Sequence, residues 1–402
     1  MDFALPPELI ELRDRVAAFI HDEVIPLEGT TAEGAELPAG TLAALRDKAR
    51  AAGIFAPQVP AEWGGLGLDM RGMSIVFEAA GRSLLGPLAL NCAAPDEGNM
   101  HLLHLVATPA QQERYLRPLA AGAIRSCFAM TEPAPGAGSD PSLLMTRAEK
   151  HGDRWVINGR KWFISGADGA AFAICMARTD DRFDGKRGAT MFLVDAGNPG
   201  FQVVRRIGGL DHMAPGGHCE VVFEDCAVAE DAVLGAVGEG FRYAQVRLAP
   251  ARLTHCMRWL GVAQRALNIA ADYVGRRSSF GKLLAEHQAI QWMVADSAIE
   301  IHAARLMIWH AAWMLDMGQQ ARQETSIAKT FVAETVNRVI DRAVQMCGSL
   351  GVSDRLPLAD FYREARAFRI YDGASEVHRM TIARRILRGA PNDSVTRPTA
   401  GE

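Results

Sequence analysis

The sequence predicts a multidomain α+β protein with helices at both ends and a β domain between them. Apolar residues recur at helical spacing before about residue 119 and after about residue 240, and at strand spacing in between. The chain has 402 residues, 49% of them hydrophobic, which is enough to bury the cores of two or three domains. We expect an N-terminal α-helical domain (1–123), a middle β-barrel or sandwich domain (124–236), a C-terminal four-helix bundle (237–390) and a tail (391–402).

The N-terminal region is predicted to be helical from about residue 7 to residue 119. Two of its later helices are expected near 70–82 and 109–121, after a Pro- and Gly-rich break at 58–68. The segment 91–100 is unusual for a helix, and we expect it to line a pocket. The first helix is predicted from the spacing of Leu9, Ile10, Leu12, Val16 and Ile20.

The middle region is predicted to consist of strands. Asn158-Gly159 suits the positive φ angles of a tight turn, and its flanks, 154–157 and 160–165, are rich in β-branched and aromatic residues. We therefore expect a hairpin there. Further strands are predicted at 171–177, 190–194, 201–207 and 219–223.

The C-terminal region is predicted to be an antiparallel four-helix bundle, because long helical runs are joined by short connections. Runs at 252–276 and 324–347 show helical spacing, and Ser297 is small enough for close packing on the face of a third helix. That face is formed by Ile290, Met293, Val294, Ile301, Ala304 and Ile308.

Composition excludes several other classes of protein. The net charge is −4 with acids and bases interspersed, which argues against a nucleic-acid-binding surface. No apolar run approaches membrane-spanning length, and the N-terminus lacks a signal or transit sequence, so we expect a cytoplasmic protein. The seven cysteines are scattered without a CxxC pair, so neither zinc nor disulfides are indicated. His212, His218, Cys219 and Cys226 are interpreted as strand residues, not as a metal site.

The stretch 361–379 is the strongest candidate for a catalytic element. We expect a helix ending near Ile370, a turn at Asp372-Gly373, and a second helix that starts at an N-cap, Ser375, and runs to Leu387. A carboxylate beside the unpaired N–H groups of a helix start can take a proton and help to stabilise the resulting oxyanion. Read alone, the Asp-Gly pair also fits an ordinary solvated turn.

This stretch resembles the Ile-Tyr-Glu-Gly-Thr-x-Glu-Ile segment of the acyl-CoA dehydrogenases, flavoenzymes that desaturate acyl-CoA thioesters. Asp372 stands where the family usually has the Glu that removes the α-proton. The Asp-Gly-x-x-Glu-Val-His form is similar to the branch whose animal members carry a fused kinase-like domain. The helix–β–helix order is also similar to that family's fold, and the resemblance covers essentially the whole chain. It implies that FAD is the cofactor and that Asp372 is the base.

Two motifs of the middle domain carry the resemblance to flavin-contacting residues. In the first motif, 127–140, a predicted strand runs into a Gly- and Pro-rich loop. In the second, 162–165, the family usually has Trp-Ile-Thr near the flavin, and Phe163 and Ser165 occupy those places here. The residues that the resemblance assigns to FAD here are Phe128, Met130, Thr131, Ser139, Phe163, Ile164 and Ser165.

Two motifs of the C-terminal domain, 276–288 and 345–351, resemble those that bind the FAD of a neighbouring subunit, which implies a homodimer or homotetramer. An Arg at the end of a helix also suits a phosphate. The resemblance assigns to FAD the residues Arg277, Phe280, His287, Gln288, Gln345, Met346, Cys347, Gly348, Ser349, Ala374 and Glu376. It assigns to substrate the residues Ser139, Ala251, Arg252 and Gly373.

The mechanism implied is α-proton removal by Asp372 and β-hydride transfer to flavin. Some family members place the base just before an Arg equivalent to Arg252. That position is Ala251 here, which cannot act as a base. Arg252 itself is expected to order the adjacent loop or the substrate. Asp372 should be ionised at pH 7, and binding of the acyl chain should raise its pKa. No Gly-x-Gly-x-x-Gly follows a strand, so FAD would bind between domains.

Three functions are compatible with this resemblance. The first is an FAD-dependent acyl-CoA dehydrogenase of fatty acid β-oxidation that passes electrons to an electron-transfer flavoprotein. The second is flavin-assisted elimination or isomerisation of a 4-phospho- or 4-hydroxyacyl-CoA. The third is a non-catalytic flavin- and DNA-binding protein of the same fold, which the charge pattern disfavours.

Overall fold

The computed structural model describes residues 3–30, 36–180, 183 and 187–388, so the predicted tail lies outside the described residues. The N-terminal part is helical, and the apolar face of its first helix is buried at Leu12 and Val16. Ile10 is exposed, because it lies on the side of the helix that faces away from the core. The helices are α1 (Pro7–Phe19), α2 (Ala39–Ala51), α3 (Met70–Ala80), α4 (Gly86–Ala89), α5 (Asp96–Val106), α6 (Pro109–Gln111) and α7 (Arg117–Ala120).

The middle part is an eight-stranded sheet whose strands pair in the order β6-β7-β3-β2-β4-β5-β8, with β1 added parallel to β4. The four separately predicted strands correspond to β4–β7, although β7 extends well past its predicted end. The strands are β1 (Ser126–Ala129), β2 (Arg147–His151), β3 (Arg154–Ser165), β4 (Phe172–Arg178), β5 (Ala189–Asp195), β6 (Phe201–Ile207), β7 (His218–Ala229) and β8 (Val233–Leu234).

The hairpin predicted at Asn158-Gly159 is wrong. β3 runs without a break through both residues, and its register against β7 shifts between Ile157 and Gly159, as at a β-bulge. A Cβ at Gly159 would come within 2.3 Å of the Thr146 Oγ1 atom, so this glycine permits a close approach and not a turn. The observed hairpin lies earlier in the chain. It joins β2 to β3 through two residues that include Gly152 at φ 62°.

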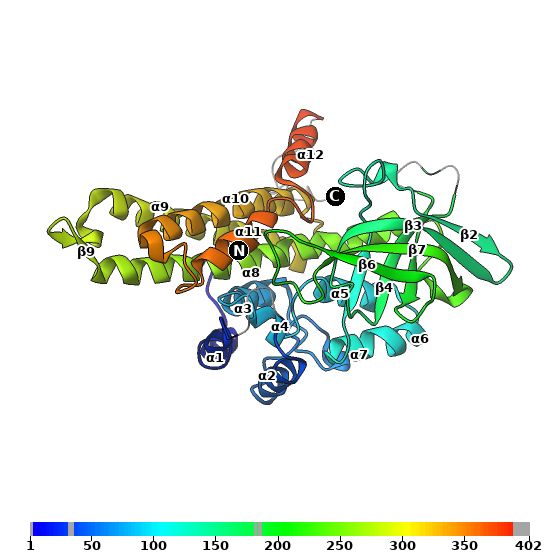
Figure 1. The fold of residues 1–402 in the computed structure, drawn as a ribbon, viewed down its shortest axis with the longest axis horizontal. Helices are drawn as coiled ribbons and strands as arrows, with labels where there is room; N and C mark the ends of the chain where they lie inside the picture. Colours follow the sequence, from blue (N-terminus) through cyan, green and yellow to red (C-terminus); the bar gives the residue numbers. More distant parts are fainter. Residues whose placement is uncertain (1–2, 31–35, 181–182, 184–186, 389–402) are drawn as a thin grey trace, which may run out of the picture.

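The C-terminal part is a bundle of three long helices, α8 (Gly240–Arg276), α9 (Gln288–Asp316) and α10 (Arg322–Cys347). A shorter helix, α11 (Leu358–Ala367), packs against α10 and α8, and α12 (Ser375–Leu387) packs against α10 and projects from the bundle (Figure 1). α8 and α9 are joined by a small hairpin, β9 (Ser278–Ser279) and β10 (Lys282–Leu283). Figure 1 shows this hairpin at one end of the long axis and the sheet at the other.

The two helical parts share one apolar core, which also takes in one face of β4 and β5, while a second core lies within the sheet. The long helix α8 is central to the shared core, since it contacts α3, α5, α9 and α10. Its inner face therefore lies between the N-terminal helices and the bundle. None of the described helices is long and apolar enough to cross a lipid bilayer.

Candidate active site at the junction of α11 and α12

The connection between α11 and α12 is longer than predicted. α11 ends at Ala367, three residues before Ile370, and α12 begins at Ser375, so Ala374 and not Ser375 is the N-cap. Ser375 cannot cap the helix because it already lies within the first turn and is buried. The reversal uses positive φ angles at two consecutive residues, Asp372 (53°) and Gly373 (98°). A positive φ angle is conformationally costly for a residue other than glycine, so Asp372 must be held in place by its surroundings.

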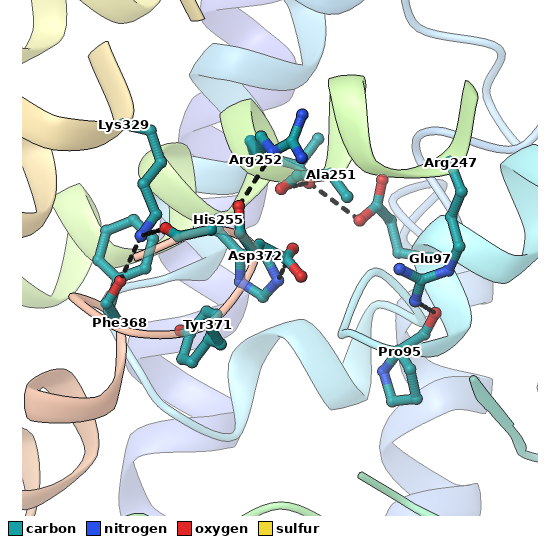
Figure 2. A network of polar contacts seen from close by, with 12 residues as sticks. Pro95, Glu97, Arg247, Ala251, Arg252, His255, Lys329, Phe368, Tyr371 and Asp372 are labelled. Carbon is teal, nitrogen blue, oxygen red and sulfur yellow. Dashed lines mark hydrogen bonds and ion pairs between the residues drawn. The ribbon is translucent and has the colours of Figure 1, made fainter. Parts of the chain in front are cut away.

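The surroundings that hold Asp372 come from α8, whose Arg252 and His255 are seen in Figure 2, and from α12. Arg252 donates from Nε to the Asp372 carbonyl oxygen at 2.9 Å, and His378 Nε2 lies 3.3 Å from the same oxygen. Arg252 therefore orders this turn, as expected from the sequence. The carboxylate is contacted by a different side chain, since His255 Nε2 lies 3.2 Å from Asp372 Oδ2. Arg252 and His255 are three residues apart on α8 and so project from the same face.

A buried lysine holds the rest of the turn. Lys329 of α10 is fully buried, and its Nζ donates to the carbonyl oxygens of Phe368 and Gly373, each at 2.8 Å. Burial lowers the pKa of Lys329 from 10.5 to about 8. Gly373 is required by space as well as by conformation, because a Cβ there would lie 2.7 Å from His378 Nε2. The backbone around Asp372 is thus fixed from three helices, α8, α10 and α12.

The electrostatics of the site keep Asp372 ionised. Burial acts to raise the pKa of its carboxyl, but the hydrogen bond from His255 and the charges of Arg247 and Arg252 outweigh burial and hold the pKa well below its usual range. Burial, together with Arg258, lowers the pKa of His255, so the imidazole is neutral at pH 7 and donates its Nε2–H to the carboxylate. The prediction that Asp372 is ionised at pH 7 is therefore confirmed.

A cavity of about 160 Å³ is lined by His255, the partner of the Asp372 carboxylate. His255, Arg258 and Tyr371 are among the polar residues that line it, and Tyr371 is fixed by the Trp259 Nε1–H, which donates to its hydroxyl at 2.5 Å. Ala93 and Ala94 line it, which confirms that the unusual 91–100 segment borders a pocket. The remaining wall is largely apolar and includes Leu84, Pro87, Leu88, Met213, Pro215, Trp259 and Val262.

Sequence reasoning missed His255, Arg258 and Lys329. The helical spacing of Arg252, His255, Arg258 and Trp259 places them along one stripe of α8, and this spacing is the signal that could have found the first two. Lys329 gives no such signal, because only the three-dimensional packing of α10 against the turn shows that it is buried.

The predicted flavin-contacting residues of the sheet lie close together. The Thr131 Oγ1–H donates to the Trp162 carbonyl at 2.7 Å, and the Trp162 N–H donates to the Thr131 carbonyl at 3.1 Å, so the two motifs run side by side. Phe163 has a φ of 51°, lies at an irregularity of β3, and is 52% exposed. An exposed aromatic side chain next to the paired Thr131 and Trp162 is a suitable platform for a planar ring such as a flavin.

Other residues of these two motifs differ in how they could contact a cofactor. Ile164 is buried in the sheet core, so only its backbone could make contact. Ser165 shares a hydrogen bond of 2.8 Å with His218 Nδ1, and Ser139 is exposed on its loop. The group is compatible with FAD through its ring platform, small hydroxyls and accessible backbone.

The residues of the 276–288 motif that are predicted to bind FAD do not join this platform within one chain. Arg277 is exposed at the end of α8, and Phe280 is 94% exposed at the tip of the β9–β10 hairpin, at the opposite end of the molecule from the sheet (Figure 1). His287 contacts the Ser279 carbonyl at 3.2 Å, and Gln288 is exposed at the start of α9. Within one chain, these residues therefore lie at the other end of the molecule from the predicted flavin platform (Figure 1).

The last predicted residues are divided between surface and interior. Gln345, Gly348 and Ser349 are exposed, whereas the side chains of Met346 and Cys347 are buried and leave only their backbone for a ligand. Near the turn, Ala374 and Glu376 flank the start of α12, and Ala251 is buried on α8 beside Arg252. Among the described residues, no group of three or more His, Cys, Asp or Glu is arranged to hold a metal ion.

Comparisons with known proteins agree on one family across the whole chain. Models described as the N-terminal, middle and C-terminal domains of acyl-CoA dehydrogenase match residues 6–123, 127–226 and 238–387. A protein of Mycobacterium tuberculosis named Probable acyl-CoA dehydrogenase FadE2 is 39% identical over 396 residues, covering 96% of either chain. Acyl-CoA dehydrogenase family member 11 of Gallus gallus is 36% identical over 92% of this chain, but the match spans only 49% of that protein. Butyryl-CoA dehydrogenase from Megasphaera elsdenii superposes with a TM-score of 0.87 at 28% identity, covering 96% of this chain and all of that one.

Proposed function

The chain belongs to the acyl-CoA dehydrogenase family of FAD-dependent oxidoreductases, and we propose that it desaturates an acyl-CoA thioester between Cα and Cβ with Asp372 as the base. The observation that carries this proposal is an ionised carboxylate fixed by His255, a residue that lines a largely apolar cavity. FAD, when bound, supplies the acceptor for the β-hydride. The protein must hold the acyl group, remove the α-proton and stabilise the resulting charge.

Proton removal falls to the Asp372 carboxylate. His255 occupies Oδ2 through its Nε2–H, which leaves Oδ1 as the oxygen that can accept the α-proton. The low pKa of the carboxyl makes it a weak base before substrate binds. Filling the cavity with an acyl chain removes water from its surroundings, and this desolvation raises the pKa toward a value useful for catalysis.

The thioester carbonyl is proposed to accept hydrogen bonds from backbone N–H groups, including that of Asp372. The N-terminus of α12 adds the positive end of a helix dipole next to this carboxylate. An oxyanion formed at the carbonyl would be stabilised by these donors, because they are fixed before the reaction by Lys329 and Arg252.

The working enzyme is proposed to be a homodimer or homotetramer in which Arg277, Phe280 and Gln288 contact the FAD of a neighbouring subunit. Their exposure at the end of the molecule remote from the Phe163 platform supports this proposal. So does the apolar exposure of Trp292, which is 61% accessible on α9 near Gln288. An electron-transfer flavoprotein is the proposed oxidant of the reduced enzyme, which would place the reaction in fatty acid β-oxidation.

The test is an anaerobic titration of the holoenzyme with a panel of acyl-CoA thioesters while the visible absorbance of the flavin is followed. We expect bleaching by at least one acyl-CoA and, in Asp372→Asn, a rate of bleaching lower by roughly 10²- to 10⁴-fold. Asp360→Asn, on the exposed face of α11, is the matched control and should retain the rate. A flavin that stays oxidised with every unsubstituted and substituted acyl-CoA contradicts the proposal. Product formation from a 4-phospho- or 4-hydroxyacyl-CoA without net bleaching would favour elimination or isomerisation.

A further inference from the structure

We propose that His218 and Asp211 are positioning residues that aim the hydroxyl hydrogen of Ser165 at the bound cofactor. The three side chains form a row in which His218 lies between the carboxylate of Asp211 and the hydroxyl of Ser165. This inference rests on the proposed function, because it takes Ser165 as a contact of FAD. It gives a role to a histidine that removal of the α-proton does not use.

The row is built where two paired strands meet a connecting segment. Ser165 is the last residue of β3 and lies opposite His218, the first residue of β7. The Ser165 Oγ atom is 2.8 Å from His218 Nδ1, and His218 Nε2 is 3.0 Å from Asp211 Oδ2. Asp211 comes from the connection between β6 and β7 (208–217), and the Asp211 and His218 side chains are 24% and 17% exposed. One imidazole ring therefore joins a carboxylate to the serine.

The protonation state of His218 decides what the serine hydroxyl can do. A serine has one O–H donor, and a neutral imidazole has one nitrogen that donates and one that accepts. If the Nε2–H of a neutral His218 faces Asp211, Nδ1 must accept the Ser165 hydroxyl hydrogen, which leaves only lone pairs for a ligand. An imidazolium carries a hydrogen on both nitrogens, so its Nδ1–H donates to Ser165 Oγ and the hydroxyl hydrogen is free for an acceptor on the cofactor.

The surroundings of His218 favour the imidazolium. Burial acts to lower the pKa of His218, but the contact with Asp211 and the charge of Glu364 outweigh burial and raise the pKa above its ordinary value. Asp211 belongs to the 208–217 connection and Glu364 to α11. Ser165 and Ile207, which β3 and β6 place opposite His218, carry no charge. Both charged groups that act on the ring are therefore acids, which stabilise its protonated form.

The connection that carries Asp211 is held in place from α11. The Glu364 carboxylate accepts the backbone N–H groups of His212 at 2.7 Å and Met213 at 3.0 Å. The side chain of His212 lies 3.4 Å from the same oxygen, so the second histidine of this segment contacts α11. These contacts fix the backbone beside Asp211, which keeps its carboxylate opposite His218.

The row adjoins the acyl cavity as well as the predicted flavin platform. Three residues from the same connection as the aspartate, Met213, Ala214 and Pro215, line the cavity. Gly166 follows Ser165 directly, and a Cβ at Gly166 would lie 3.5 Å from the Pro215 carbonyl oxygen. Ser165 therefore lies where the wall of the cavity meets the end of β3 that carries the flavin platform. A fixed donor at this point can orient the ring of the cofactor relative to the acyl group.

The same three residue types occur in serine hydrolases, but this row is not arranged for acyl transfer. A hydrolase serine must give its hydroxyl hydrogen to a neutral histidine when it attacks the carbonyl. The acids around His218 favour the imidazolium, which has no lone pair at Nδ1 to take that hydrogen. The row therefore orients the serine and does not activate it as a nucleophile.

The test is the dissociation constant of FAD, measured by dilution of the holoenzyme and fluorescence of the released FAD. The pH runs from about 6 to about 9, the range in which a histidine of raised pKa loses its proton. We expect Ser165→Ala to weaken FAD binding roughly 3- to 10-fold at pH 6, the usual scale for one hydrogen bond. The ratio between variant and wild type should fall toward one as the pH rises, because neutral His218 withdraws the hydroxyl hydrogen. Ser165→Thr, which keeps a hydroxyl, should behave as the wild type does.

Substitution of His218 separates positioning from packing. His218→Leu should weaken FAD binding at pH 6, but it should cause no further weakening when combined with Ser165→Ala, because it acts only through that hydroxyl. Asp211→Asn, which removes the carboxylate charge, should move the pH at which FAD binding weakens to a lower value. His151→Asn, at an exposed histidine of β2, is the matched control and should keep the pH dependence of the wild type.

A ratio between Ser165→Ala and wild type that stays constant over this pH range overturns the inference. So does an equal effect of His218→Leu with and without Ser165→Ala, or release of free CoA from an acyl-CoA that is lost in Ser165→Ala. The first comparison decides the question even if the His218 variants do not fold. FAD binding is measured without an acyl-CoA, so an enzyme that reduces its flavin but shows a constant ratio contradicts only the role of His218. A protein that binds no FAD contradicts the proposed function itself.

Discussion

Replacement of Lys329 by Met tests whether this buried ammonium, and not packing alone, holds the turn that carries Asp372. The methionine side chain is similar in length and apolar, but it cannot donate to the Phe368 and Gly373 carbonyl oxygens, which both lie 2.8 Å from Nζ. Two hydrogen bonds from a charged donor contribute about 1.5–3 kcal/mol each. Their loss, about 3–6 kcal/mol in total, is the destabilising part of the change.

An opposing part comes from removal of the buried charge. The pKa of Lys329 falls from 10.5 to about 8 because of burial. At about 1.36 kcal/mol for each pH unit between the two values, burying the protonated amine costs the folded state roughly 3 kcal/mol below pH 8. Near pH 7 we therefore expect Lys329→Met to lower the free energy of unfolding by only about 0–3 kcal/mol, since the two parts largely offset each other.

The pH dependence of stability distinguishes the loss of the two hydrogen bonds from the removal of the buried charge. Between pH 8 and 10.5 the unfolded chain keeps the proton on Lys329 and the folded protein loses it, so the unfolded state binds more protons and stability rises with pH. The neutral amine still has two N–H donors for two carbonyls, so the turn keeps both hydrogen bonds. Methionine cannot gain in this way, and the stability gap between wild type and variant should widen by about 3 kcal/mol from pH 7 to pH 10.5.

The assay is denaturant-induced unfolding of the holoenzyme at pH 7, 8.5 and 10, with wild type and variants at one protein concentration. Lys329→Arg is the control, because an arginine keeps its donors but does not lose its proton in this range. Both variants should fall progressively behind the wild type as the pH rises. A gap of the same size at pH 7 and pH 10 would refute the reasoning.

The remaining predictions concern one side chain of the site and one residue of the sheet. His255→Leu should raise the pKa of Asp372 by about one to two units, because a hydrogen bond to a carboxylate contributes about 1.5–3 kcal/mol. Since protonated Asp372 cannot accept the α-proton, the acid limb of the pH–rate profile for flavin reduction should move to higher pH by that amount. His255→Gln, which keeps an N–H, should move the acid limb less. Coincident profiles for wild type and His255→Leu would argue against this role of His255. Gly159→Ala should lower the free energy of unfolding by about 1–3 kcal/mol, because the new Cβ would lie 2.3 Å from Thr146 Oγ1. Gly197→Ala, which meets no atom within 4 Å, should be nearly neutral by the same denaturation assay, and equal losses in the two variants would contradict the close-approach argument.

The order and type of the secondary-structure elements could be predicted from the sequence because each long element has a clear hydrophobic period. The Asn158-Gly159 turn was predicted wrongly because a local dipeptide preference says nothing of the neighbour across the sheet. Thr146 packs against the backbone of Gly159, and its Oγ1–H donates to the buried carboxylate of Glu132 at 2.5 Å. The same carboxylate pairs with the fully buried Lys161 at 2.9 Å. A glycine selected for close packing is therefore indistinguishable, in sequence, from a glycine selected for a turn.

The candidate base could be found from the sequence because Asp372 and Gly373 are adjacent and lie in one recognisable stretch, whereas the packing partner of Gly159 is distant in the sequence. The groups that determine its behaviour come from elsewhere in the chain: His255 and Arg252 from α8, and Lys329 from α10. Their role depends on burial, and a histidine or lysine at a helical position is equally consistent with a solvated face. The shift in the Asp372 pKa could not have been predicted without knowing which of these side chains are desolvated.

The site separates the positioning of Asp372 from the control of its charge. The two strongest donors, Arg252 and Lys329, bind neutral carbonyl oxygens, so they fix the backbone without being neutralised by the groups they hold. Their positive charge remains in the site, and burial has already lowered the pKa of both. That field helps to keep the carboxylate ionised but also makes it a poor base, and only His255 contacts the carboxylate itself among the described residues.

The basicity of Asp372 must therefore increase when the acyl group displaces water from the cavity, which links the rate of proton removal to how completely the acyl group fills the cavity. On this reasoning, acyl groups too short to fill the cavity should lose kcat as well as affinity, whereas a cavity that served only for binding would change KM alone.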